Sequence, residues 1–200
     1  MEKDLKTRTP QELAAIAAEF GGKSYTARYI FTYLHQHNVN DINLMTTLAK
    51  EMRRKLIDAG FYITQLKIED KLTDPDGTVK YLFQTADGSK IESVLLDETG
   101  RKTICVSTQV GCRLGCKFCA TGALGFIRNL DAGEIIDQVS AICADSQCRV
   151  NNVVFMGMGE PLENYDNVFR AVRIFASDIG KQIGARRQTI STVGIPDGIR

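Results

Sequence analysis

From residue 102 onward, apolar strand-like runs alternate with amphipathic helical runs. The strand-like runs are TICVSTQV (103–110), NNVVFMGMG (151–159) and RRQTISTVG (186–194), and the helical runs between them are DAGEIIDQVSAICA (131–144) and NVFRAVRIFASDIG (167–180). Strands that alternate with helices form parallel β/α units with right-handed crossovers. A complete barrel of such units takes about 250 residues. The segment 102–200 therefore predicts an α/β fold with an incomplete barrel of about three β/α units.

Two further zones precede this pattern. Residues 1–63 are predicted to form a helical module, because Thr9-Pro10-Gln11-Glu12 has the form of a capping box and Gly60 follows the last helical run. Helices are expected at ELAAIAAEF (12–20), YTARYIFTYLHQH (25–37) and LMTTLAKEMRRKLIDAG (44–60). Residues 64–101 alternate with a period of two residues, which predicts an antiparallel β meander. Its strands are LKIEDKL (66–72), VKYLFQT (79–85) and KIESVLL (90–96), with turns at DPDG (74–77) and ADGS (86–89).

Composition restricts the setting in which the chain works. It is 44% hydrophobic and 24% charged, with a net charge of +1, so any nucleic-acid partner must be met by local basic patches. No apolar run approaches the roughly 20 residues of a membrane span, and MEKDLKTRTP lacks the apolar core of a secretory signal. We therefore expect a cytoplasmic protein without a membrane partner. In a reducing cytosol, six cysteines are expected to be metal ligands, catalytic thiols or buried thiols.

Three of these cysteines form a tight cluster with the spacing C-x3-C-x2-C, at Cys112, Cys116 and Cys119. A zinc site is one interpretation, with a fourth ligand from Cys105, Cys143 or Cys148. Three buried thiols are a second, although the charged and glycine residues between the cysteines favour an exposed loop. A [4Fe-4S] cluster is the third interpretation. Held by three cysteines, such a cluster keeps one iron free to bind S-adenosylmethionine (SAM).

A glycine-rich segment, MGMGEP (156–161), follows an apolar strand about 40 residues after the cysteines. Glycines at 157 and 159 allow a backbone to approach a ligand closely, and Glu160 can accept hydrogen bonds from an ammonium group. The alternative is a plain tight turn between a strand and a helix.

Longer strings narrow the interpretation to one family. VSTQVGCRLGCKFCATG, GFIRNL, VVFMGMGEPLENYDNV and RRQTISTVG, with YTARYIFTYLHQ and DGTVKYLF nearer the N-terminus, resemble the RlmN/Cfr family of radical-SAM RNA methyltransferases, and more closely its RlmN branch. The resemblance implies a partial radical-SAM (β/α) barrel that holds a [4Fe-4S] cluster and SAM. It also implies methylation of C2 of adenosine in 23S rRNA, and in tRNA, through an S-methylcysteine and a 5′-deoxyadenosyl radical.

The resemblance also implies roles for individual residues. Cys112, Cys116 and Cys119 match the cluster ligands, and Phe118 matches the aromatic residue that precedes the last of them. The residues matching SAM contacts are Gly157, Gly159, Glu160 and Ser191.

Two further positions match catalytic residues of the family. Glu92 matches the proton acceptor, although taken alone it is an ordinary exposed strand carboxylate. Cys105 matches the resolving cysteine, which forms a disulfide with the methyl-carrying cysteine, although a buried core thiol is its simpler interpretation.

The methyl-carrying cysteine itself has no match in these 200 residues, since neither Cys143 nor Cys148 lies where the family's motif requires it. We therefore expect a C-terminally truncated, N-terminal part of a methyltransferase that does not turn over alone. The expected partners are RNA and an electron donor such as flavodoxin, and the expected state is a monomer. Alternatives are a radical-SAM enzyme of another substrate class and a zinc-binding RNA-interaction module.

RNA binding has the weakest basis in the sequence. A basic face on the third predicted helix, at Lys50, Arg53 and Arg54, can contact phosphates, as can Arg186 and Arg187. On the sequence alone, the preferred interpretation is an ordinary solvated helix face balanced by the acidic residues Glu51 and Asp58.

Overall fold

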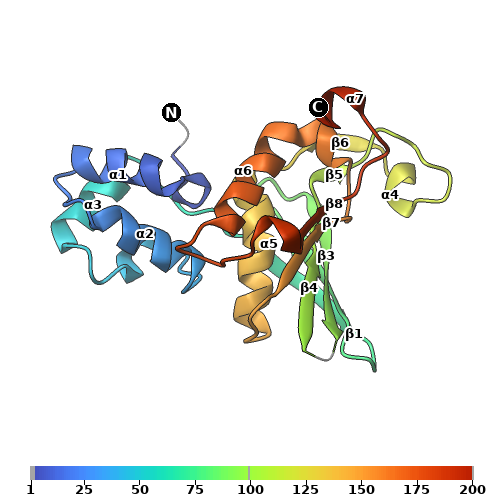
Figure 1. Ribbon diagram of the computed structural model, residues 1–200, viewed down its shortest axis with the longest axis horizontal. Helices are drawn as coiled ribbons and strands as arrows, with labels where there is room; N and C mark the ends of the chain where they lie inside the picture. The colour runs from blue at the N-terminus through green and yellow to red at the C-terminus, as the bar shows by residue number, and fades with distance from the viewer. Residues whose placement is uncertain (1–2, 99, 200) are drawn as a thin grey trace.

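The computed structural model describes residues 3–98 and 100–199 and arranges them in three layers (Figure 1). An N-terminal helical module forms the first layer, two longer helices form the second, and a β-sheet forms the third. The outer limits of the predicted zones, residues 1 and 200, lie outside the described part. The mixed α/β class predicted from the sequence is confirmed. Among the described residues, no helix is both long and apolar enough to cross a membrane.

The helical module consists of α1 (Pro10–Glu19), α2 (Thr26–His35) and α3 (Lys50–Asp58). The predicted capping box is confirmed, because the Thr9 N–H donates to Glu12 Oε2 at 2.8 Å and the Glu12 N–H donates to Thr9 Oγ1 at 3.2 Å. The predicted start of the third helix at residue 44 is wrong. A 3-10 turn (Ile42–Leu44) and an irregular segment precede α3, and their buried apolar residues, Met45 and Leu48, imitate a helical period.

The sheet has six strands in the order β1-β2-β3-β4-β7-β8. The first four pair antiparallel, and β7 and β8 continue the sheet in parallel with β4. Their bounds are β1 (Lys67–Thr73), β2 (Val79–Gln84), β3 (Lys90–Glu98), β4 (Arg101–Cys105), β7 (Asn152–Phe155) and β8 (Gln188–Ile190). The predicted meander therefore shares one sheet with the β/α segment, and the division of the chain into three zones stays a prediction.

One predicted strand is divided in two. The run 103–110 forms β4 up to Cys105, leaves the sheet, and resumes as β5 (Gln109–Gly111), which pairs antiparallel with β6 (Phe126–Asn129). The break occurs because the Ser107 backbone bonds to a side chain: its N–H donates to Gln138 Oε1 at 2.7 Å, and its carbonyl accepts from Gln138 Nε2 at 3.0 Å. The short helices α4 (Ala120–Ala123) and α7 (Pro196–Ile199) complete the structure.

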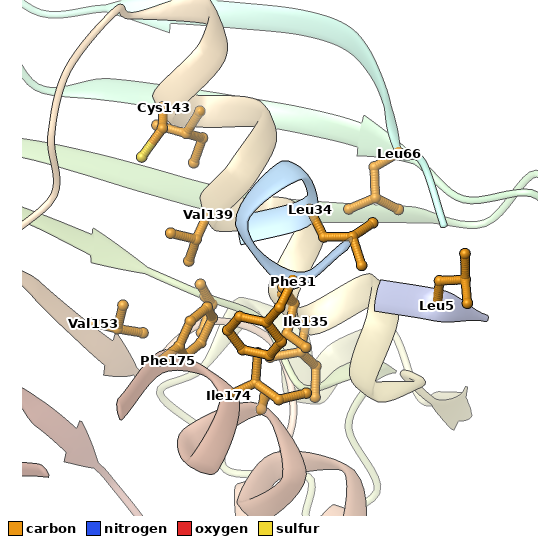
Figure 2. Close-up of a cluster of buried hydrophobic side chains, with 14 of the residues drawn as sticks. Leu5, Phe31, Leu34, Leu66, Ile135, Val139, Cys143, Val153, Ile174 and Phe175 are labelled. Carbon is orange, nitrogen blue, oxygen red and sulfur yellow. The ribbon is translucent and has the colours of Figure 1, made fainter. Parts of the chain in front are cut away.

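The core lies between the sheet and the helical module. α5 (Ala132–Asp145) and α6 (Tyr165–Ala176) cover one face of the sheet, and α2 packs on their outer side. Figure 2 shows the side chains that fill this contact, from Val153 on the sheet through Val139 and Phe175 to Phe31 and Leu34 on α2. One continuous apolar cluster therefore joins the three layers.

A buried polar contact also fixes the N-terminal segment to α5. The Lys6 ammonium pairs with Asp137, and the two side chains are 1% and 6% exposed. Lys6 Nζ also donates to the Thr64 carbonyl at 2.7 Å, while Asp137 Oδ2 accepts from the Leu66 N–H at 2.6 Å. Charges this deeply buried are tolerated only when they are paired and hydrogen-bonded. The pair therefore fixes the position of the helical module relative to the sheet.

Candidate active site

The loops that follow β4, β7 and β8 converge on one cavity. Because these strands are parallel, their carboxyl ends lie at the same edge of the sheet. The cavity has a volume of about 380 Å³. It is lined by Cys112, Leu114, Cys116, Phe118, Cys119, Thr121, Phe155, Met156, Gly157, Gly159, Glu160, Ser191, Thr192 and Val193. The structure thus brings together eight of the ten residues that the sequence analysis selected, and Glu92 and Cys105 lie elsewhere.

A short hairpin holds the cysteine loop at this cavity. The Cys112 N–H donates to the Gly125 carbonyl at 2.9 Å, which closes the β5–β6 hairpin at the start of the loop. Arg113 adds two contacts, since its guanidinium lies 4.1 Å from the Phe126 ring centre and its Nε lies 3.2 Å from Glu163 Oε2. These contacts therefore hold the start of the cysteine loop in a fixed position.

The thiols of this loop are accessible. Cys112 and Cys116 are half-buried, Cys119 is exposed, and Phe118 is 94% exposed. Backbone N–H groups at the start of α4, first that of Gly122 and then that of Thr121, lower the pKa of Cys119. Across residues 3–98 and 100–199, no three His, Cys, Asp or Glu side chains stand close enough to share one metal ion. The three thiols face a common cavity without forming a compact ligand set.

The glycine-rich segment packs tightly against the segment that follows β4. The Gly157 N–H donates to the Val106 carbonyl at 3.0 Å, and a Cβ added at Gly157 would lie 2.7 Å from Ser107 Oγ. Gly159 has φ +100°, and an added Cβ there would lie 2.5 Å from the Gln109 Cβ. Contacts within the protein therefore already require both glycines, whether or not a ligand also approaches them.

Glu160 joins two of the three loops. It is 3% exposed, its Oε1 accepts from the Leu162 N–H at 3.0 Å, and its Oε2 accepts from the Val193 N–H at 3.0 Å. An ionised carboxylate has about four acceptor positions. Glu160 thus fastens the segment after β8 to the segment after β7 and keeps acceptor capacity on the wall of the cavity.

Glu92 and Cys105 lie on the face of the sheet opposite α5. Ser93 Oγ donates to Gln138 on α5 at 2.6 Å, so its neighbours Glu92 and Val94 point the other way. Cys105 pairs directly with Val94 and shares that face. Glu92 is exposed, with Oε1 3.1 Å from Lys80 Nζ, whereas burial raises the pKa of the Cys105 thiol.

All six cysteines are free thiols. The disulfide that the resemblance implies for Cys105 therefore has no support in this chain, whose sequence lacks the implied partner. Cys143 and Cys148, considered as fourth zinc ligands, line a different cavity from the cysteine loop.

Sequence reasoning missed two polar residues whose hydrogen bonds hold the backbone segments around the site in place. Gln138 is fully buried on α5 and makes the bonds that end β4. Asn164 Nδ2 donates to the carbonyls of Thr108 and Leu130, at 2.8 and 2.7 Å, and so fixes both ends of the cysteine-bearing segment. The signal that could have revealed Gln138 is its position between Ile135 and Ile142, which share one face of the helix at i, i+3 and i+7.

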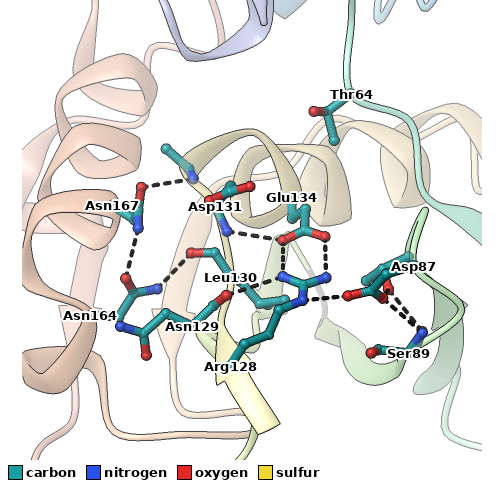
Figure 3. A network of polar contacts seen from close by, with 12 residues as sticks. Thr64, Asp87, Ser89, Arg128, Asn129, Leu130, Asp131, Glu134, Asn164 and Asn167 are labelled. Carbon is teal, nitrogen blue, oxygen red and sulfur yellow. Dashed lines mark hydrogen bonds and ion pairs between the residues drawn. The ribbon is translucent and has the colours of Figure 1, made fainter. Parts of the chain in front are cut away.

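Arg128, within the GFIRNL string, is a third supporting residue. Figure 3 shows its guanidinium between Asp87, in the β2–β3 turn, and Glu134 on α5. Two guanidinium nitrogens donate to Glu134, at 2.7 and 2.8 Å, and Nε donates to Asp87 Oδ2 at 2.6 Å. Hydrogen bonds from Arg128 and Thr85 lower the pKa of Asp87. β6, and with it the hairpin below the cysteines, is thereby tied to two other elements.

Comparison with known proteins shows which families the chain resembles. Residues 3–60 match the model described as the ribosomal RNA large subunit methyltransferase N-terminal domain, and residues 106–198 match that of the radical SAM superfamily. The probable dual-specificity RNA methyltransferase RlmN of Pseudothermotoga lettingae is 48% identical over 90% of this chain and 53% of that protein. The dual-specificity RNA methyltransferase RlmN of Geobacter sulfurreducens is 45% identical over 96% of this chain and 52% of its own length.

A solved structure supports the same conclusion. The crystal structure of a radical SAM methyltransferase from Sphaerobacter thermophilus matches with a TM-score of 0.87 and 42% sequence identity, covering 96% of this chain and 57% of that one. The chain therefore spans about half the length of the relatives it matches. The two family models match the N-terminal and C-terminal parts of the chain, and the relatives described above are similar to it over nearly all of its residues. The chain therefore belongs to the RlmN/Cfr family of radical-SAM proteins.

Proposed function

We propose that the protein is a radical-SAM methyltransferase that modifies C2 of adenosine in 23S rRNA and in tRNA. The cavity at the carboxyl ends of β4, β7 and β8 carries the proposal, because it gathers the three cysteines, the glycine-rich segment and Ser191. The names of the relatives add the substrate class, since they are dual-specificity RNA methyltransferases.

Cys112, Cys116 and Cys119 would hold a [4Fe-4S] cluster, and the donor set fits it. Three thiols come from one loop, all line the cavity, and no fourth cysteine lines it. When bound, such a cluster supplies the single electron that cleaves a carbon–sulfur bond of SAM.

The opposite wall of the cavity would hold SAM. Glu160 offers its remaining acceptor positions to the amino group, and its bonds to Leu162 and Val193 keep the carboxylate oriented. Gly157 and Gly159 line this wall with backbone groups, and Ser191 adds a hydroxyl just after β8. Phe118 lines the same cavity from the cysteine loop. These assignments rest on the resemblance to the family and on the cavity that the residues share.

Two residues outside the cavity would handle protons and thiols. Glu92, exposed beside Lys80, would accept a proton from the RNA, and Cys105 would act as the resolving cysteine. Their common face of the sheet supports this assignment. Because burial raises the pKa of Cys105, this residue is held as a neutral thiol near pH 7.

The expected partners are RNA and a flavodoxin-type electron donor, and we place the monomeric protein in the cytoplasm. Six free thiols fit that reducing compartment. α3 contributes less to RNA binding than its composition suggests. Arg53 bonds to the Asn43 carbonyl, Arg54 lies 3.4 Å from Asp58 in an ion pair, and Lys55 and Glu51 form another.

Electron paramagnetic resonance tests the cofactor assignment directly. The chain is reconstituted anaerobically with iron and sulfide, reduced with dithionite, and measured with and without SAM. We expect a [4Fe-4S]⁺ signal that SAM changes, and loss of that signal in Cys116→Ala. Cys148→Ala, whose thiol lies at another cavity, is the matched control and should keep the signal. Colourless protein that binds zinc through the same cysteines would overturn the proposal.

A further inference from the structure

A second cavity lies at the junction between the helical module and the β/α segment. Its volume is about 410 Å³. It is lined by His35, Gln36, Asn38, Cys143, Cys148, Arg149, Val150, Gly180, Lys181 and Gln182. The junction is closely packed, because a Cβ added at Gly180 would lie 3.0 Å from Phe31 and 3.2 Å from the His35 Cβ. None of these residues lines the cavity of the cysteine loop.

Two thiols meet at this second cavity. Cys143 lies in the last turn of α5 and is 7% exposed, whereas Cys148 follows the helix and is half-buried. Cys143 and Cys148 lie close enough for each thiol to shift the pKa of the other. Ser146 Oγ lies 3.1 Å from the same sulfur and 2.6 Å from the Ile142 carbonyl. A serine hydroxyl has one proton to donate. Ser146 donates it to the Ile142 carbonyl when Cys148 is a protonated thiol, and can rotate to donate it to the sulfur when Cys148 is a thiolate.

The surroundings assign the thiolate to Cys148. The hydrogen bond from Cys143 lowers the pKa of Cys148 most, followed by that of Ser146 and the charge of Lys102, against the opposing effects of burial and Asp97. The same hydrogen bond and its deeper burial raise the pKa of Cys143. Lys181, whose Nζ donates to Asn38, adds a second cation facing the pair.

A buried imidazole completes the cavity wall. His35 is 1% exposed, and among the described residues neither of its ring nitrogens has a hydrogen-bond partner. Burial, followed by the charges of Lys6 and Lys181, lowers the pKa of His35, so the ring is neutral near pH 7. A neutral imidazole has one N–H donor and one bare nitrogen acceptor. His35 therefore keeps one donor and one acceptor without a partner beside the cavity.

We propose that Cys143 and Cys148 form an oxidisable dithiol site, in which Cys148 attacks a hydroperoxide and Cys143 resolves the product as a disulfide. The site needs neither the iron–sulfur cluster nor SAM, and it is separate from the disulfide expected for Cys105. Two neighbouring cysteines that line one open cavity, with Ser146 Oγ 3.1 Å from the Cys148 sulfur, form an arrangement that makes cysteines selectively oxidisable.

The chemistry balances with a hydroperoxide as the sole oxidant. The Cys148 thiolate attacks one peroxide oxygen, an S–O bond forms, the O–O bond breaks, and the other oxygen leaves as hydroxide or alkoxide. The attacked oxygen keeps its hydrogen, so the product on Cys148 is a sulfenic acid, and the departing hydroxide or alkoxide takes a proton from solvent. The Cys143 sulfur then attacks the sulfur of Cys148, and the sulfenic oxygen leaves as water with the Cys143 proton. Two electrons from the two sulfurs have reduced one peroxide.

The sequence makes the site easy to measure. Trypsin cleaves after Arg128 and Arg149, so Cys143 and Cys148 share the peptide 129–149, which contains no other cysteine. The reduced chain is exposed anaerobically to equimolar hydrogen peroxide, alkylated at intervals and examined by mass spectrometry. We expect this peptide to lose two hydrogens and to become resistant to alkylation about tenfold sooner than Cys105, a half-buried thiol that serves as the reference.

Two variants separate the roles of the thiols. Cys143→Ser should accumulate a sulfenic acid at Cys148, trapped by dimedone, because the resolving thiol is gone. Cys148→Ser should leave Cys143 alkylatable, because the attacking thiolate is gone. Circular dichroism checks that both variants fold, and the wild-type measurement stands without them. The proposal is overturned if both thiols stay alkylatable when Cys105 has oxidised, or if Cys143 oxidises equally fast without Cys148.

Discussion

Two glycines that flank Cys112 both have positive φ but different surroundings. Gly111 has φ +73°, and a Cβ added there would lie 1.8 Å from the Gly125 carbonyl oxygen, whereas Gly115 has φ +60° and open space. Gly115→Ala should therefore cost only the backbone strain, about 1–2 kcal/mol of unfolding free energy. Gly111→Ala should cost clearly more and separate β5 from β6. Denaturant unfolding compares the two, and equal losses would show that the hairpin does not depend on this close approach.

His35 makes stability depend on pH. Burial lowers the pKa of His35, so below about pH 6.5 the unfolded chain takes up a proton that the folded chain does not. Stability is therefore full above this pH and should fall as pH drops, by up to about 1.4 kcal/mol per pH unit for this group. Unfolding of His35→Leu at several pH values between about 5 and 7 should show a shallower dependence than the wild type. The same change at exposed His37 is the control, and should leave the slope unchanged.

Single residues also show where sequence reasoning reached its limit. The spacing of Cys112, Cys116 and Cys119 pointed to one cavity wall, because three residues in eight positions cannot move far apart. Glu160 was expected to face a ligand, and its bond from the Leu162 N–H is local, but its bond from the Val193 N–H depends on a loop more than thirty residues away. No local pattern carries that information.

Among the elements, α5 carries the contact on which the helical module depends. Asp137→Ala would leave the Lys6 ammonium buried without its partner and should lower the unfolding free energy by about 3–5 kcal/mol. Asp58→Ala removes the partner of Arg54 in an exposed pair, 83% and 66% exposed, and should cost less than about 1 kcal/mol. Denaturant midpoints test the contrast. Similar losses would mean that Lys6 reaches water in the variant.

Element boundaries were predictable where the signal is local. The capping box at Thr9 and Glu12 placed the start of α1, and Gly60, with φ +81°, follows the end of α3. The run 103–110 looked like one strand because its apolar residues continue past Cys105. Its division depends on Gln138, a residue of the following helix, and so could not be predicted from the run itself.

For the molecule as a whole, activity should require more than these residues. The sequence has no match to the methyl-carrying cysteine, so the chain incubated with RNA, SAM and reductant should form no 2-methyladenosine. Mass spectrometry of digested nucleosides provides the measurement, with the RlmN relative from Geobacter sulfurreducens as the positive control. Product above background with the chain alone would show that another cysteine carries the methyl group.

The two edge strands of the sheet differ in how readily they can pair with a further strand. β1 has four charged residues among seven, and nearly all of its side chains are exposed. Charges on an edge strand discourage pairing with further strands. β8, at the other edge, is Gln-Thr-Ile and has no charge. Any strand that extends this sheet would therefore join beside β8, which Ser191 directly follows, so that an added strand would lie near the cavity and not at the β1 edge.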